Sequence, residues 1–241
     1  MQLPFFFLEN FDEHSDRQVL SDDSSRHILQ VLRMKQGESL HLTDGKGLLI
    51  TGVLSGVEKK KAVVEVQHIE KVPPNIRQVY MGVSLLKNAT RFEWFLEKAG
   101  ELGVDGVIPL ICERTERRQF RMDRARQILI SAILQSQKCY LPELMEPVQF
   151  DQLMHTAYLS RYDKKWIAHC AEDEKISIRD MNDETYYNGL ILIGPEGDFS
   201  EREIQLAKNT GFVAVSVGEE RLRTETAAVA AAAFLIIWSS A

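Results

Sequence analysis

The alternation of short apolar segments with amphipathic helical segments after residue 75 constrains the fold more than any other feature of the sequence. Two segments with apolar residues at helical spacing, 90–102 and 122–133, lie among apolar runs of strand length. The spacing Thr90-x-x-Glu93 predicts a capping box at the start of the first helix, and Gly103 is placed to end it. We therefore expect an α/β domain whose mostly parallel sheet is covered on both faces. The expected strands are 79–85, 107–112, 166–170, 190–193 and 212–217.

The N-terminal part of the chain has a different pattern, that of a small β-barrel. Apolar or alternating runs predict strands over 39–42, 48–54 and 62–69, and one short amphipathic helix is expected over His27–Arg33. Pro73-Pro74 then interrupts the pattern, because prolines donate no ladder hydrogen bonds and bias their neighbours to extended backbone. We place a domain boundary there, with domains over 1–72 and 73–241.

Composition restricts the classes of function. The net charge is -6, so any attraction to nucleic acid has to come from local basic patches. Cys112, Cys139 and Cys170 are far apart and form no CxxC pair, which argues against a disulfide framework and a zinc site, so we expect no metal. The longest apolar run, Ala227–Trp238, is shorter than the roughly 20 residues of a membrane span. With no basic-then-apolar leader at the N-terminus, we expect a cytoplasmic protein that does not associate with membranes.

The segment Ile193–Ser200 is the first candidate for chemistry. Gly194, Pro195 and Gly197 form a rigid turn after an apolar strand, and Ser200-x-x-Glu203 has the spacing of a second capping box. Ligands of open α/β sheets bind at such turns, at the carboxyl ends of the strands. The spacing is not GxGxxG, which disfavours a dinucleotide site. A tight turn without a ligand stays open as the alternative.

A second strand-to-helix turn lies at 217–227. Arg221 and Arg223 stand in this charged loop, Thr224 is the expected N-cap, and Glu225 is placed favourably against the helix dipole. The helix that follows is apolar all round as far as Trp238, so we expect it to be buried, against another helix of this chain or across a dimer. We expect the two turns to form one pocket, although the two arginines also fit the alternative of solvated loop charges.

Leu192–Ile204 and Val217–Ala228 together resemble the SPOUT methyltransferases, and more narrowly the ribosomal RNA small subunit methyltransferase E family. The sequences of these segments are LIGPEGDFSEREI and VGEERLRTETAA. Three further stretches are similar to segments of that family, so the resemblance covers nearly the whole chain. They are 27–33 with 44–47, 86–87 with 97–104, and 134–138 followed by 141–142. Three positions depart from the family pattern: Asp198 stands where a third glycine is usual, Leu134 replaces a frequent glutamate, and Lys138 replaces a frequent arginine.

The resemblance implies a parallel α/β sheet with a C-terminal trefoil knot near 189–241 and an N-terminal RNA-binding barrel of PUA type. It also implies a homodimer that binds S-adenosylmethionine in three loops and methylates N3 of a uridine in 16S ribosomal RNA, with the RNA held within the small ribosomal subunit. The cofactor-binding residues implied are His169, Ile193, Gly194, Pro195, Gly197, Val217, Gly218, Leu222 and Thr226.

Three residues are catalytic candidates for this reaction. The N3 proton of uridine has to leave, so a base or a group that stabilises the developing anion is needed. Arg223 is the candidate for stabilising negative charge on the uracil carbonyls. Glu196 or Glu225 is the candidate proton acceptor, with capping of a turn or helix as the alternative role for each.

RNA affinity requires local positive charge, and the segment 114–126 supplies it. This segment contains six arginines and two acidic residues, which gives it a net charge of +4. A solvated charged surface is the alternative. The RNA-binding candidates, from this segment and from the resemblance, are Arg33, Arg114, Arg117, Arg118, Arg121, Gln135, Ser136 and Lys138.

Two other functions remain open from the sequence. One is methylation of a ribose 2′-oxygen in transfer or ribosomal RNA, and the other is RNA binding without catalysis. A hydrolase is disfavoured, because the chain has no GxSxG or HExxH motif.

Overall fold

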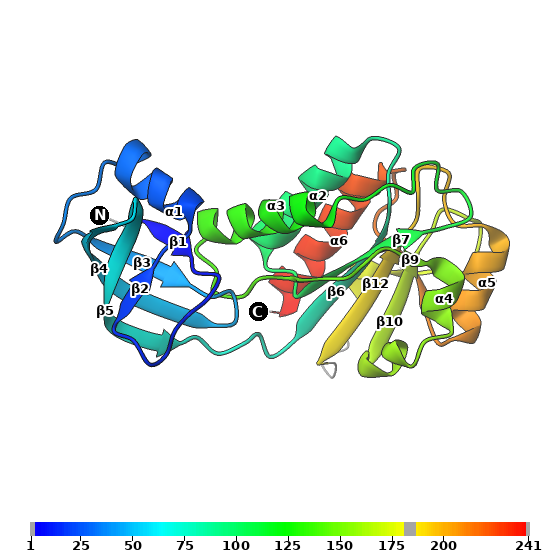
Figure 1. The fold of residues 1–241 in the computed structure, drawn as a ribbon. Helices are drawn as coiled ribbons and strands as arrows, with labels where there is room; N and C mark the ends of the chain where they lie inside the picture. The colour runs from blue at the N-terminus through cyan, green and yellow to red at the C-terminus, as the bar shows by residue number, and fades with distance from the viewer. Residues whose placement is uncertain (1–2, 181–186, 240–241) are drawn as a thin grey trace. The chain divides into compact units, whose positions relative to one another are not determined.

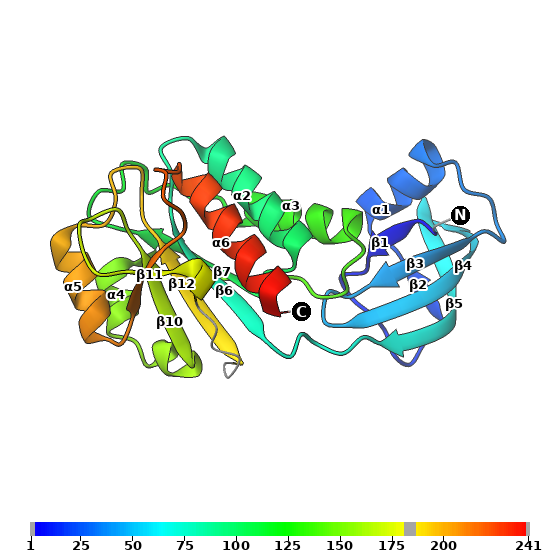
Figure 2. The ribbon, with the colours of Figure 1, turned by 180° about the vertical axis from the view of Figure 1, so that it is seen from behind.

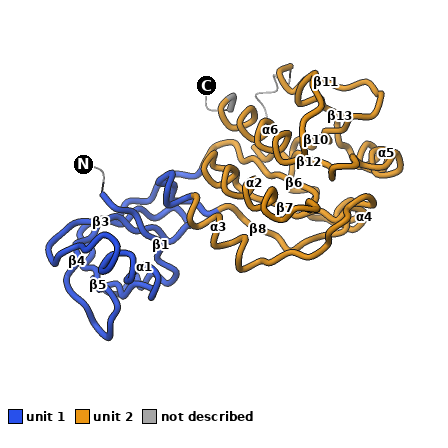
Figure 3. Tube along the Cα trace, turned by 90° about the horizontal axis from the view of Figure 1, so that it is seen from above, with its two compact units in different colours: residues 1–74, 133–141 blue, residues 75–132, 142–241 orange. Residues whose placement is uncertain are grey.

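Figure 1 shows the computed structural model, which describes residues 3–180 and 187–239. The chain divides into two compact units. The first comprises Met1–Pro74 with Ile133–Leu141, and the second comprises Asn75–Ala132 with Pro142–Ala241 (Figure 3).

The first unit is built on a five-stranded mixed sheet in the order β1-β3-β4-β5-β2. β1 pairs with β3 in parallel, and the other neighbours are antiparallel. Register shifts at Thr51/Gly52 and Leu54/Gly56 interrupt the long β4–β5 ladder, as β-bulges do where a sheet bends. Leu40, Leu42 and Val64 point into its core. The strands are β1 (Phe5–Phe7), β2 (Arg17–Val19), β3 (Ser39–Thr43), β4 (Leu48–Glu58) and β5 (Lys61–Lys71).

The helix of the first unit begins earlier than the sequence predicts. α1 spans Asp22–Arg26, and the Ser21 side chain caps it by accepting a hydrogen bond from the Ser24 backbone N–H. A π-helical turn over His27–Val31 continues it. The expectation of a helix over His27–Arg33 is therefore wrong at both ends, because the polar first turn carries no apolar periodicity and Arg33 lies outside with a φ of 54°.

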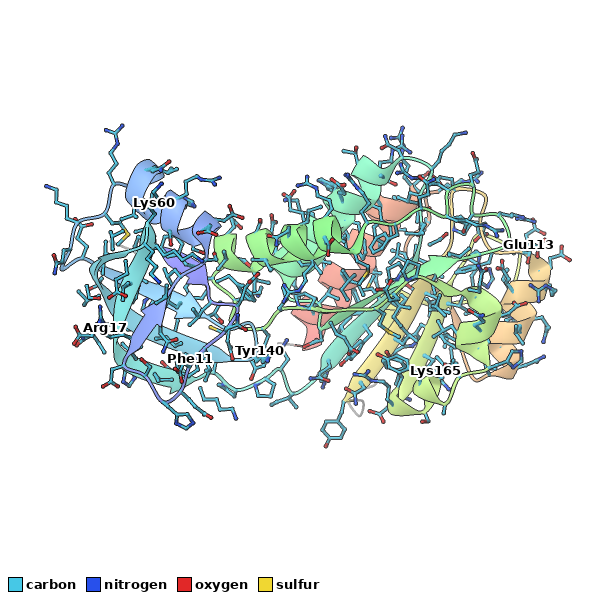
Figure 4. The ribbon with its side chains drawn as sticks, viewed as in Figure 1. Phe11, Arg17, Lys60, Glu113, Tyr140 and Lys165 are labelled. Carbon is cyan, nitrogen blue, oxygen red and sulfur yellow. The ribbon has the colours of Figure 1, made fainter. Side chains whose placement is uncertain are left out.

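The segment Ile133–Leu141 lies far from the rest of the first unit in the sequence but packs with it. The Tyr140 hydroxyl donates a 2.8 Å hydrogen bond to the Val72 carbonyl, and its ring lies over Gly47, where an added Cβ would be 2.4 Å from the Tyr140 oxygen. Tyr140 is labelled in Figure 4. The predicted boundary after residue 72 assigned this segment to the second domain, whereas in the structure it belongs to the first unit.

The second unit contains an eight-stranded sheet in which every pair is parallel, as the alternation of strands and helices predicts. The order is β11-β13-β10-β12-β6-β7-β8, and β9 also pairs with β7. Its strands are β6 (Gln78–Ser84), β7 (Gly106–Ile111), β8 (Glu143–Leu144), β9 (Val148–Gln149), β10 (Lys164–Ala168), β11 (Ile176–Ser177), β12 (Asn188–Ile193) and β13 (Val213–Ser216). Its helices are α2 (Ala89–Leu102), α3 (Met122–Gln135, which continues into the first unit), α4 (Phe150–Met154), α5 (Glu201–Asn209) and α6 (Thr224–Ser239). Short 3₁₀ turns lie at Ala157–Arg161 and Ile178–Asp180.

Helices cover both faces of this sheet (Figures 1 and 2). Leu190 and Leu192 of β12 pack in one core cluster with residues of α4 and α5. α6 contacts β6 and β12 on the other face and packs against α2. The alternation of side chains along buried strands thus fills two layers, as expected for a parallel sheet. The trefoil knot expected near 189–241 stays a prediction.

The start of α2 differs from the expected capping box at Thr90. Asn88 is the N-cap, and its side chain accepts a hydrogen bond from the Thr90 backbone N–H. The expected end is confirmed, because Gly103 is the C-cap in the left-handed region, with a φ of 93°.

Within the single chain, α6 is buried on one side only, and burial of the rest across a dimer stays a prediction. Ala228, Ala231 and Leu235 are buried, but Ile237 is 65% exposed. The side chain of Trp238 lies outside the described residues. α6 thus presents a partly exposed apolar surface, although no helix in the described part of the chain is long and apolar enough to cross a membrane.

Candidate functional site

The register of the sheet brings three strand ends together. Ala168 at the end of β10 pairs with Ile193 at the end of β12 and with Val215 near the end of β13. Because the strands are parallel, the loops that follow them leave the same edge of the sheet side by side.

The turn after β12 folds tightly around Gly194. An added Cβ at Gly194 would lie 3.0 Å from the Phe199 ring and 3.1 Å from its backbone nitrogen. The Asp198 N–H donates to the Pro195 carbonyl at 2.9 Å. Ser200 and Glu203 form the predicted capping box, which fixes the start of α5 directly after the turn.

Two residues that follow β7 hold this turn from outside. The Arg114 guanidinium donates to the Gly197 carbonyl at 2.7 Å, and the Glu113 N–H donates to the buried Glu203 carboxylate at 2.8 Å. The Ser200 hydroxyl donates to the Glu113 carboxylate at 2.9 Å, and Figure 4 shows Glu113 beside α5. The structure therefore engages Arg114, an RNA-binding candidate, in supporting the turn.

The loop after β13 is less crowded than the turn after β12. An added Cβ at Gly218 would meet no atom within 4 Å. The Ser216 hydroxyl donates to the Gly218 carbonyl at 2.8 Å. The Ala227 N–H donates to the Arg223 carbonyl at 2.8 Å, and Thr224 is the first residue of α6. The N-cap position therefore falls at Arg223, one residue before the predicted Thr224.

Both turns line one cavity of about 630 Å³, together with the loop after β10. This volume is within the range of pockets that hold cofactor-sized ligands. The lining residues are 168–170, 175, 193–196, 198, 215–224 and 227.

Most of the predicted cofactor and catalytic residues lie on this cavity. It brings together His169, Ile193, Gly194, Pro195, Val217, Gly218 and Leu222 with Arg223 and Glu196. Gly197 and Thr226 do not line it. Glu225 does not line it either: its carboxylate is buried and lies 3.6 Å from the Arg91 guanidinium. The Glu196 carboxylate accepts a hydrogen bond from the Lys87 N–H at 3.2 Å.

Lys175, Thr224 and Asp198 also line the cavity, although the sequence did not predict them as cofactor-binding residues. The Lys175 ammonium donates to the His169 and Ala171 carbonyls at 3.1 and 2.8 Å. Contacts to backbone carbonyls leave no pattern in the sequence, so Lys175 could not be predicted. Asp198 had a signal, since an acid replaced an expected glycine.

His169 has an unusual environment on this cavity. Its side chain is fully buried, and both ring nitrogens lack a hydrogen-bond partner within the described residues. Burial and the nearby Lys175 ammonium lower the pKa of His169 below its usual value, so the ring is neutral at pH 7. The ring lies behind the cavity wall, with Nε2 3.8 Å from the Asp173 carboxylate, and the exposed part of His169 is its backbone.

The cavity fits a sulfonium cofactor. Ile193, Val215 and Leu222 supply apolar surface, and Glu196 and Asp198 supply carboxylates suited to a positive charge. Within the described residues, no group of three or more His, Cys, Asp or Glu side chains is arranged to hold a metal ion.

The RNA-binding candidates fall in both units. Arg117 and Arg121 lie beside Phe92 and Phe120 between α2 and α3, and Arg118 is exposed nearby in the sequence. Arg33 belongs to the first unit, as do Gln135, Ser136 and Lys138 at and after the end of α3.

Comparison with known proteins shows the family. Residues 73–236 match the model of an RNA methyltransferase domain, and residues 20–67 match that of an RNA methyltransferase PUA domain. The chain therefore belongs to the RNA methyltransferases, within the family of ribosomal RNA small subunit methyltransferase E.

Individual relatives agree with this assignment. A ribosomal RNA small subunit methyltransferase E from Mesomycoplasma hyopneumoniae is 30% identical over 169 residues, which are 67% of this chain and 71% of the relative. The crystal structure of a probable rRNA methyltransferase from Porphyromonas gingivalis is 36% identical, with a TM-score of 0.87 over 99% of both chains. The ribosomal RNA small subunit methyltransferase E from Neisseria gonorrhoeae, bound to S-adenosylmethionine, is 29% identical, with a TM-score of 0.86 over 98% of both chains.

Proposed function

We propose that the chain transfers the methyl group of S-adenosylmethionine to N3 of a specific uridine in 16S ribosomal RNA. The observation that carries the proposal is the single cavity that the two turns of the RNA methyltransferase domain line together. The names of the relatives support ribosomal RNA of the small subunit as substrate, and the bound cofactor of the Neisseria gonorrhoeae structure supports S-adenosylmethionine.

S-adenosylmethionine supplies an electrophilic methyl group on a sulfonium, and the protein has to hold donor and acceptor in line. The backbone at Gly194, Pro195 and Gly218 can approach the cofactor closely, and the backbone of His169 lines the same cavity. Ile193, Val217 and Leu222 give the cavity apolar surface. Gly197 supports the turn from behind, through its hydrogen bond with Arg114.

Arg223 and Glu196 are the residues of this cavity suited to the proton chemistry. The Arg223 side chain is exposed on the cavity, where a guanidinium can stabilise negative charge on the uracil carbonyls. The Glu196 carboxylate, held by the Lys87 N–H, can accept the N3 proton. Glu225 is less suited, because it is buried away from the cavity and paired with Arg91.

RNA is held by basic residues outside the cavity. Arg117, Arg118 and Arg121 are proposed to contact phosphates, since arginines beside the partly exposed Phe120 offer both charge and stacking surface. In the first unit, Arg33, Gln135, Ser136 and Lys138 are proposed RNA contacts, in keeping with the match to an RNA methyltransferase PUA domain.

The functional assembly is proposed to be a homodimer in the cytoplasm that acts on the small ribosomal subunit. The partly exposed apolar surface of α6 supports a dimer, because the half-buried Ala230 and Ala233 let a second helix approach closely and Ile237 remains 65% exposed in the single chain.

Nucleoside mass spectrometry tests the proposed reaction. 16S rRNA and small subunits from a strain lacking the gene are incubated with the wild-type protein, Arg223→Ala or Arg179→Ala and S-adenosylmethionine. We expect N3-methyluridine with the wild type and with Arg179→Ala, a change at an exposed arginine that does not line the cavity, and more than a hundredfold less with Arg223→Ala. A 2′-O-methylated nucleoside, or no methylated product, would contradict the proposal.

A further inference from the structure

Asp198 adopts a backbone conformation that side chains rarely take. Its φ is 65°, and among the described non-glycine residues with positive φ it is the one that lines the cavity. Aspartate tolerates this region better than most residues, but glycine reaches it at lower cost. The side chain therefore has to contribute something that glycine would not.

Both carboxylate oxygens of Asp198 accept hydrogen bonds from the backbone. The Cys170 N–H donates to Oδ2 at 2.8 Å, and the Phe199 N–H donates to Oδ1 at 2.8 Å. Phe199 belongs to the turn after β12, whereas Cys170 belongs to the loop after β10. The carboxylate thus joins two walls of the cavity that come from segments 28 residues apart.

The rest of the loop after β10 is held by contacts of a different kind. Lys175 donates to carbonyls of the loop itself, at His169 and Ala171. Asp173 pairs with Lys208 and so holds the middle of the loop to α5. The Lys175 contacts keep the loop compact, and the Asp198 bond attaches its first residues to the turn.

We propose that Asp198 is a positioning residue that holds the loop after β10 against the turn after β12, so that the cavity keeps the shape S-adenosylmethionine requires. The ligand in this inference rests on the proposed function, whereas the joining of the two loops does not. Asparagine does not replace both contacts, because it has one carbonyl oxygen for the two N–H donors.

Hydrogen exchange tests the joining of the loops without cofactor. Protein labelled with ¹⁵N-cysteine gives amide signals from Cys112, Cys139 and Cys170. In Asp198→Gly, which keeps the backbone conformation, we expect the Cys170 amide to exchange at least tenfold faster. The Cys112 amide, which donates to the Thr115 hydroxyl in the core, should be unchanged and reports on the intact fold. If exchange at the Cys112 amide also becomes faster, the Asp198→Asn variant is measured instead. The Cys170 amide of this variant should then exchange at a rate between those of the wild type and Asp198→Gly.

Calorimetric titration with S-adenosylmethionine tests the consequence. We expect Asp198→Gly to raise Kd about tenfold, as loss of one charge-assisted hydrogen bond predicts, and Asp198→Asn to raise it less. Glu172→Gln removes an exposed carboxylate of the same loop and should leave Kd unchanged. Unchanged exchange at Cys170, unchanged Kd in Asp198→Gly, or an equal rise in Glu172→Gln overturns the proposal. If the wild type binds no S-adenosylmethionine, the proposed function fails, and exchange at Cys170 alone decides whether Asp198 joins the loops.

Discussion

The Arg91 guanidinium lies 3.6 Å from the Glu225 carboxylate and so joins the first turn of α2 to the first turn of α6. The Glu225 side chain is 9% exposed, and its Oε2 has no hydrogen-bond partner within the described residues. A buried carboxylate is costly unless a positive charge compensates it. The pair therefore anchors the helix that begins directly after the second cavity turn.

Arg91→Met should lower the free energy of unfolding by about 1–3 kcal/mol, because it leaves the Glu225 charge uncompensated. Urea unfolding of the single and double variants measures this. In the Glu225→Gln background, where no charge needs compensation, the same substitution should cost clearly less. Arg26→Met, which breaks an exposed pair with Asp23, should cost less than about 1 kcal/mol and serves as control. Equal costs for Arg91→Met in both backgrounds would show that the pair is not coupled.

Gly194→Ala and Gly218→Ala should differ in their effect on stability. The new Cβ at 194 meets the Phe199 ring and backbone at 3.0–3.1 Å, so we expect a loss of about 1–3 kcal/mol from overpacking. The Cβ at 218 meets nothing within 4 Å, so the change should stay within about 0.5 kcal/mol. Thermal or urea unfolding of the two variants provides the comparison. A Gly218→Ala variant as unstable as Gly194→Ala would mean that the described difference in crowding is wrong.

Arg114 should behave differently from its neighbours in the basic segment. Arg114→Ala removes the hydrogen bond to the Gly197 carbonyl, so it should weaken S-adenosylmethionine binding with little change in the salt dependence of RNA binding. Arg117→Glu with Arg118→Glu should leave cofactor binding intact and reduce the salt slope of RNA affinity by about 2, one for each lost phosphate contact. Titrations at several salt concentrations separate the two. An unchanged slope in the double variant would exclude this segment as the phosphate contact.

The sequence predicts the buried strands and the turn at Gly194, but not the contacts between residues that are distant in the chain. The runs around Leu190–Ile193 and Val107–Ile111 are predictable, because strands buried on both faces are continuously apolar. The turn at Gly194 is predictable because its residue types and position after a strand are local properties. The role of Arg114 is not, because the charge of an arginine does not reveal which carbonyl it contacts. The packing of Ile133–Leu141 with the first unit depends likewise on a contact, between Tyr140 and Val72, that no local pattern encodes.

Local patterns can also compete. Thr90-x-x-Glu93 has the spacing of a capping box, but Asn88 caps α2 because its own side chain reaches the Thr90 N–H. The apolar sequence of α6 correctly indicates a helix that requires cover, but not that part of its surface is left uncovered by the rest of the chain.

The lowered pKa of His169 predicts a pH dependence of stability. Because burial holds the folded-state pKa below the usual value of about 6.5, the unfolded chain binds a proton first as the pH falls. Stability from this group is therefore complete above about pH 6.5 and is lost as the pH falls toward the folded-state pKa. His169→Gln, neutral throughout, should show a smaller fall in the free energy of unfolding between about pH 7 and 5. His155→Gln, a change at an exposed histidine, should keep the wild-type slope.

Ile237→Asp should dissociate the proposed homodimer, because it places a charge on the apolar surface of α6. Analytical ultracentrifugation should give a monomer with unchanged circular dichroism. Ile76→Asp changes a residue that is 83% exposed outside any helix or strand, and it should leave the dimer intact. A wild-type protein that is monomeric at micromolar concentration would contradict the assembly.

A crystal structure of the chain with S-adenosylmethionine tests the central claim most directly. We predict one molecule per chain in the cavity, in contact with both Gly194 of the turn after β12 and Leu222 of the loop after β13. A cofactor bound elsewhere, or touching only one of these two segments, would contradict the account.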